Sequence, residues 1–153
     1  MSQLIDDSLD FVSSLFATNL PSTCLYHNLT HTKRVLKSTK EIIANSNLTN
    51  EEVDILLLAA ILHDTGYIEC SSGHEEASVE IAVKFLKEKS VSDSIIAQVT
   101  KCILATKLEA EPQTTLEKII RDADASHFAK HYFLETSELL RLELKLQGIA
   151  EYT

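Results

Sequence analysis

Residues 51–67 read EEVDILLLAAILHDTGY and indicate how the whole chain is organised. The run from Ile55 to Leu62 is apolar at every position, so a helix formed by it has no polar face. Such a helix is stable only where other elements cover it on all sides. The pattern therefore predicts a central helix over residues 51–64, with Gly66 as its C-terminal cap.

Amphipathic helices that could cover this central helix are indicated before it in the sequence. Apolar residues at spacings of four, three and four predict a first helix that is ended by Pro21; they are Ile5, Leu9, Val12 and Phe16. Asn28 can cap a second helix over residues 28–45. Both helices would bury one apolar face against the central helix.

Further helices are predicted after the central one. Ser72 and Glu75 match a capping box, as do Thr114 and Glu117. Between the two helices that these boxes begin, residues 95–103 have helical apolar spacing. A last helix is expected over 132–147.

The composition agrees with an all-α fold. The chain of 153 residues has only 3 Gly and 2 Pro, fewer turn residues than a sandwich or barrel of short strands normally needs. Hydrophobic residues make up 44% of it, enough for a buried core. We therefore expect a single compact helical domain over residues 1–153, with about six to seven helices.

The charge of the chain limits its partners. Acidic residues outnumber basic ones 23 to 14, for a formal charge of -9. Binding to nucleic-acid polymers or to anionic membranes relies on basic surface, so neither is expected. A small anionic substrate is still allowed, because a bound cation can supply positive charge locally.

The cysteines and the N-terminal segment indicate a cytoplasmic protein. The three cysteines form no CxxC pair, which argues against a disulfide framework or a thiolate zinc site. The first twenty residues carry acidic residues within their apolar pattern, unlike a secretory signal. No apolar run approaches the roughly 18 residues that a membrane span needs.

His63 and Asp64 end the most apolar helix and are the first candidates for chemistry. They could simply cap the helix end, but an imidazole and a carboxylate at the tip of a core helix lose hydration unless each has a partner. A metal ion would satisfy both. His31 lies in the first turn of the preceding helix, whereas His27 precedes the Asn28 cap and could equally be a loop histidine or a support for a ligand.

Two acidic residues near the end of the helical pattern are further candidates. Asp122 and Asp124 are two residues apart, so on a helix their side chains point in different directions. One could face a site while the other faces solvent. A solvated acidic face is an equally good interpretation from spacing alone.

Four phrases of the sequence resemble the HD-domain superfamily of metal-dependent phosphohydrolases: Tyr26–His31, Ala59–Tyr67, His74–Ser78 and Arg121–Asp124. Their order of His, His-Asp and Asp is the signature of that superfamily. The resemblance implies an all-α fold and cleavage of phosphate esters or anhydrides, usually in nucleotides. It also implies one metal ion held by four residues: His31, His63, Asp64 and Asp124.

Other residues are assigned by their distance from these motifs. Glu69 follows the His-Asp pair where related enzymes often use a carboxylate, so it is a candidate for proton transfer, with a solvated loop residue as the alternative. His74 is the only histidine between Asp64 and Asp124, which favours one ion over two. It is expected to contact substrate or to bind a second ion weakly, with surface exposure as the alternative. Arg34 and Lys107 could bind a substrate phosphate, or could be surface charges.

The expected chemistry follows from the donor atoms. Two imidazoles and two carboxylates suit Mn²⁺, Fe²⁺, Co²⁺ or Zn²⁺, with Mg²⁺ as a further candidate. A water on such an ion becomes a nucleophile at neutral pH, and Asp64 could orient it. We therefore expect a phosphomonoesterase or phosphodiesterase acting on a small phosphorylated molecule, in particular a nucleotide. The alternative is a non-catalytic helical module that binds a metal or a nucleotide for regulation.

Overall fold

The computed structural model describes residues 2–69, 72–125 and 133–146. These residues form seven α-helices and one short 3₁₀ helix, without strands, which confirms the all-α fold. None of the helices described is long and apolar enough to cross a membrane. The elements are α1 (Ser2–Asn19), α2 (Leu29–Ala44), α3 (Asn50–Leu62), η1 (Thr65–Ile68), α4 (His74–Glu88), α5 (Asp93–Leu104), α6 (Thr115–Asp124) and α7 (Phe133–Leu146).

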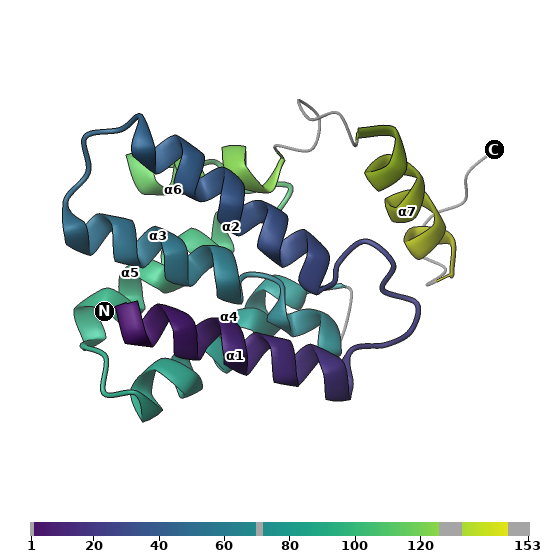
Figure 1. The fold of residues 1–153 in the computed structure, drawn as a ribbon, viewed down its shortest axis with the longest axis horizontal. Helices are drawn as coiled ribbons and strands as arrows, with labels where there is room; N and C mark the ends of the chain where they lie inside the picture. Colours follow the sequence, from purple (N-terminus) through teal and green to yellow (C-terminus); the bar gives the residue numbers. More distant parts are fainter. Residues whose placement is uncertain (1, 70–71, 126–132, 147–153) are drawn as a thin grey trace.

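Helix α3 is the centre of the fold, as its sequence predicts. It packs against α1, α2, α5 and α6, and Figure 1 shows α1 and α2 on either side of it. Seven of its residues are buried: Ile55, Leu56, Leu58, Ala59, Ala60, Ile61 and Leu62. The surrounding helices each pack an apolar face against α3. The burial of α3 therefore limits where the ends of those helices can lie.

Side chains cap several of these helices. The oxygen of Asn28 accepts a hydrogen bond from the backbone N–H of His31, which confirms Asn28 as the N-cap of α2. Thr114 caps α6 in the same way, as predicted. Thr49 and Glu52 form a reciprocal capping box at the start of α3, which the sequence analysis did not identify. These caps satisfy backbone N–H groups that a helix leaves unpaired.

The predicted cap at Ser72 is wrong. Helix α4 begins at His74, and its N-cap is Gly73, which makes no side-chain capping bond. Gly73 has φ of +74°, in the left-handed region that favours glycine. This turn at Gly73 places Ser72 before the cap position, so Ser72 and Glu75 do not form the box.

The predicted role of Gly66 is also wrong. Gly66 lies within η1, not at a left-handed cap of α3, because the chain continues from α3 into this 3₁₀ turn. Its N–H donates to the hydroxyl of Ser78, at 2.8 Å from N to Oγ. A Cβ at position 66 would lie 2.7 Å from the backbone N of Ser78. Glycine is needed there because η1 and α4 approach each other closely.

Helix α7 lies at the edge of the molecule, beside the loop that joins α1 and α2 (Figure 1). A last helix was expected over 132–147, and residues 133–146 of it are helical. Residues 132 and 147 lie outside the described residues.

We expect Gly66→Ala to lower the free energy of unfolding by about 1–3 kcal/mol, because the added methyl group must push α4 away from η1. Urea denaturation of the metal-free protein measures this. Gly73→Asn is the matched control, since asparagine tolerates the left-handed conformation and a Cβ there would make only an ordinary contact, 3.9 Å from Glu76 Oε2. Equal stability of Gly66→Ala and the wild type would contradict this account of the η1–α4 contact.

Candidate metal centre

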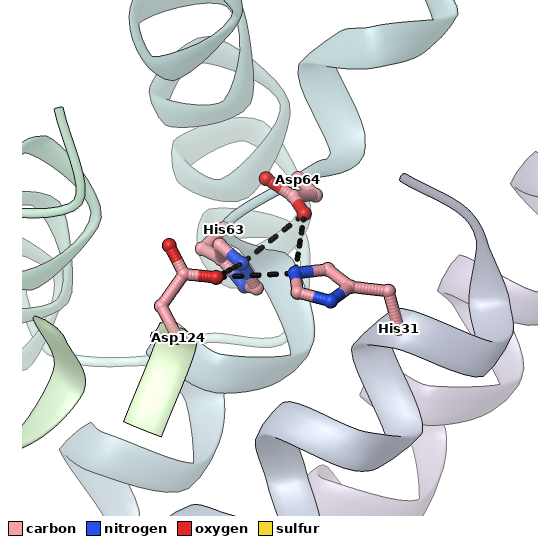
Figure 2. A group of neighbouring side chains, drawn as sticks. All are labelled: His31, His63, Asp64 and Asp124. Atoms are coloured by element: carbon pink, nitrogen blue, oxygen red, sulfur yellow. Dashed lines mark hydrogen bonds and ion pairs between the residues drawn. The ribbon is translucent and has the colours of Figure 1, made fainter. Parts of the chain in front are cut away.

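Three helix ends bring four predicted site residues together (Figure 2). His31 comes from the first turn of α2, which the Asn28 cap fixes. His63 and Asp64 directly follow α3, and Asp124 is the last residue of α6. The site therefore forms where the C-terminal ends of α3 and α6 meet the N-terminal end of α2.

The donor atoms of this cluster face one another. The Nε2 atom of His31 lies 3.3 Å from Asp64 Oδ2 and 3.1 Å from Asp124 Oδ1. The Nε2 atom of His63 lies 3.2 Å from each of the same two oxygens. All four donor atoms are within 4.8 Å of one another.

Most of the cluster is out of contact with solvent. The exposed fractions of the side chains are 0% for His63, 4% for Asp64, 7% for His31 and 28% for Asp124. Solvent therefore reaches the cluster from the Asp124 side. Asp64 Oδ2 is fully buried and has no hydrogen-bond partner among the described residues. A buried carboxylate oxygen without a hydrogen bond is costly unless a cation stabilises it.

The ring of His63 is oriented for use as a ligand. Its Nδ1 lies 2.8 Å from the carbonyl oxygen of Ala60, which can only accept a hydrogen bond. Nδ1 must therefore carry the proton, and in the neutral ring this leaves the lone pair on Nε2, facing the two carboxylates. Metal-binding histidines commonly have this arrangement.

In the metal-free cluster, His63 and the two carboxylates shift one another's pKa values toward the charged forms. Burial acts to lower the pKa of His63, but the carboxylates of Asp64 and Asp124 outweigh it and raise that pKa well above its usual value. Burial acts to raise the pKa of Asp64, but the facing charge of His63 and the contact with His74 outweigh it and hold the pKa well below its usual value. The pKa of Asp124 is lowered in the same way. The cluster thus holds carboxylates and a proton together.

These four residues fit a divalent ion. Two ligands that are each about 2.1 Å from an ion and subtend about 90–110° are roughly 3.0–3.4 Å apart, as the facing donors here are. The set contains two neutral-capable imidazoles and two carboxylates, which suits a borderline divalent metal. The neighbouring Asp122 is exposed on α6, so of the two acidic residues it is Asp124 that joins the cluster.

His74 lies against the cluster but on its outer side. Its Nε2 is 3.3 Å from Asp64 Oδ1 and 3.2 Å from Glu75 Oε2, and its side chain is 13% exposed. Burial acts to lower the pKa of His74, while Asp64 and Glu75 raise it and prevail. His74 therefore offers a ring N–H beside the candidate ligand Asp64.

The remaining predicted residues are not among the four clustered donors. Glu69 is exposed where η1 ends, and Arg34 is half-buried on α2. Lys107 pairs with Glu76 of α4 and lies 3.7 Å from Glu109. The assigned roles in proton transfer and phosphate binding stay predictions for these three residues.

Glu143 and Tyr67 were not predicted from the sequence as functional residues. The ring of His27 stacks on Tyr67, and Tyr67 stacks on His74, with ring centroids 4.1 and 4.0 Å apart. Glu143 of α7 is fully buried and its Oε2 forms a hydrogen bond with Nδ1 of His27. Its signal in the sequence is a carboxylate on the same helical face as Leu139 and Leu140, where an apolar residue is expected.

A comparison with protein-family models matches residues 28–129 to the HD domain, about two-thirds of the chain. No curated protein and no solved structure gives a significant match. The matched region contains all four residues of the cluster, and the all-α fold is that of HD domains. The chain therefore belongs to the HD-domain family, whose members are generally metal-dependent phosphohydrolases.

Proposed function

We propose that the protein is a metal-dependent phosphohydrolase that cleaves a phosphate ester or anhydride in a small phosphorylated molecule, with a nucleotide as the expected substrate. The observation that carries this proposal is the convergence of two imidazoles and two carboxylates, with a buried oxygen of Asp64 that no hydrogen bond satisfies. His31, His63, Asp64 and Asp124 would hold one divalent ion.

The role of the chain is to hold donors and exclude water on all but one side. A divalent ion bound there would lower the pKa of a bound water and polarise a phosphoryl oxygen. Asp64 has Oδ2 toward His31 and His63 and Oδ1 toward His74. One oxygen can therefore bind the ion while the other holds the His74 ring in place. The partial exposure of Asp124 leaves one side for a substrate to enter.

Binding of a phosphoryl group needs positive charge, which this acidic chain has little of. His74 offers a ring N–H next to the cluster, and Arg34 is one turn along α2 from His31. Either group could hydrogen-bond to substrate oxygens. We assign both to substrate binding, and Glu69 to proton transfer.

The first prediction concerns metal binding. We expect isothermal titration with Mn²⁺ to give one ion per chain in the wild type, and Asp124→Ala to weaken the affinity at least tenfold because a ligand is lost. Asp122→Ala is the matched control, as it removes an exposed carboxylate two residues away on the same helix. Equal effects of the two substitutions would mean that Asp124 is not a ligand.

The second prediction concerns catalysis. A panel of nucleoside monophosphates, nucleoside polyphosphates and cyclic nucleotides should show phosphate or nucleotide release that strong chelation abolishes. Asp64→Ala should lower the rate about a hundredfold or more, roughly 3 kcal/mol of transition-state stabilisation. Arg34→Ala should mainly raise KM. Metal uptake without turnover of any compound would instead support a non-catalytic regulatory module.

The third prediction concerns His74. We expect His74→Ala to raise KM or to lower kcat while the first Mn²⁺ ion is still bound, because the ring lies beside Asp64 outside the four-residue set. Steady-state kinetics on the panel substrate and a Mn²⁺ titration measure the two effects. Glu80→Ala, which changes an exposed residue of the same helix, is the control. Unchanged kinetics would remove His74 from the site.

A further inference from the structure

Glu143 is a charged residue of α7 that is completely buried. Its Oε1 accepts hydrogen bonds from the backbone N–H groups of Tyr26 and His27, each at 2.9 Å. Its Oε2 pairs with Nδ1 of the His27 ring. Burying a carboxylate costs free energy unless its oxygens are satisfied, and here three donors from one short turn satisfy them. This contact docks α7 on that turn.

The turn held by Glu143 leads directly into α2 and the candidate ligand His31. Asn28 donates from its side chain to the carbonyl of Leu25 at 2.9 Å, and its side-chain oxygen accepts from the N–H of His31. The ring of Tyr26 also lies against the ring of His31, with centroids 4.5 Å apart. A shift of the turn would therefore move the first turn of α2 and the His31 ring.

A second route runs through stacked rings. With Nδ1 of His27 donating to Glu143, Nε2 can accept from the hydroxyl of Tyr67, which lies 3.2 Å away. The ring of Tyr67 contacts the rings of both His27 and His74, whose own centroids are 6.1 Å apart. His74 in turn faces Asp64. The carboxylate of Glu143 thus sets the tautomer of His27, and through it the position of two rings beside the cluster.

We propose that Glu143 is a positioning residue that couples the docking of α7 to the geometry of the metal centre, through His31 by one route and through His74 and Asp64 by the other. The effect on metal binding rests on the function proposed above. Because coupling is reciprocal, undocking α7 weakens binding of the ion, and binding of the ion tightens α7. The last helix is in this sense part of the site, although it lies at the edge of the fold (Figure 1).

The test uses three variants of the full chain. Glu143→Ala removes all three hydrogen bonds. Glu143→Gln keeps an oxygen for the two backbone N–H groups but presents an N–H to His27, which reverses the tautomer of that ring. Glu138→Ala is the control, because Glu138 is an exposed glutamate of the same helix whose ion pair is with Arg141 in α7 itself.

The first measurement is made on metal-free protein labelled with ¹⁵N, by NMR of the histidine rings. We expect Glu143→Ala to shift the ring signals of His27, His31 and His74. Glu143→Gln should shift those of His27 and His74 and leave His31 near its wild-type position. Glu138→Ala should shift none of them. If only the His27 signals move in both Glu143 variants, the proposal is overturned.

The second measurement is the affinity for Mn²⁺ together with amide hydrogen exchange. We expect Glu143→Ala to weaken Mn²⁺ binding about tenfold, the lower end of what loss of a supporting contact costs a metal site. Mn²⁺ should slow exchange in α7 of the wild type and of Glu138→Ala, but not of Glu143→Ala. Wild-type affinity in a folded Glu143→Ala variant would overturn the proposal.

The two proposals fail in different ways. A wild-type protein that binds none of Mn²⁺, Fe²⁺, Co²⁺, Zn²⁺ and Mg²⁺ contradicts the metal centre, and the ring signals of the metal-free protein then decide the role of Glu143 alone. If Glu143→Ala does not fold, Glu143→Gln is used in its place. A shifted His74 ring signal and a changed rate of amide exchange in α7 then support the role of Glu143, and wild-type values of both overturn it.

Discussion

The burial of an ionisable pair at the tip of an apolar helix is the constraint on which this structure depends. Helix α3 has no polar face and must be covered on all sides, and its chain leaves the core through His63 and Asp64, which are almost fully buried. Withdrawing such groups from water costs several kcal/mol unless opposite charges meet them. The N-terminal end of α2 and the C-terminal end of α6 therefore have to lie where they do, because they carry His31 and Asp124 to the pair.

Because of the direction of α3 and α6, the carboxylates of this cluster are poorly placed to cap these helices and well placed to bind a cation. Asp64 and Asp124 lie at the C-terminal ends of α3 and α6, where the helix dipole already places partial negative charge. Carboxylates stabilise helices at the opposite end, so these two do not serve as ordinary caps. Two helix C-termini and two carboxylates instead concentrate negative potential at one point. A divalent ion there would interact favourably with the carboxylates and with the C-terminal ends of α3 and α6, which outweigh the opposing N-terminal end of α2.

Sequence patterns predicted those parts of the fold that depend on neighbours along the chain. The caps at Asn28 and Thr114 act over three residues, and the central helix follows from an uninterrupted apolar run. The role of Gly66 could not be predicted, because it depends on how closely α4 approaches η1. The choice between Asp122 and Asp124 likewise needed the rotation of α6, or the resemblance to a family. Glu143 is 117 residues from Tyr26 in sequence, so no local pattern relates the two.

Apart from Asp64 Oδ2, the buried charged groups of this region have polar partners, which can keep the metal-free cluster in shape. Asp64 and Asp124 raise the pKa of His63 well above its usual value, which favours a proton on the Nε2 atom that faces the two carboxylates when no ion is present. An ion bound at Nε2 would compete with that proton, so in either state the carboxylates would face a positive charge. The contact of His74 with Asp64 and the contact of Glu143 with the turn before α2 do not involve the Nε2 atom of His63, where proton and ion compete. They can therefore hold the donors in position before the ion arrives, which lowers the cost of ordering them when it binds.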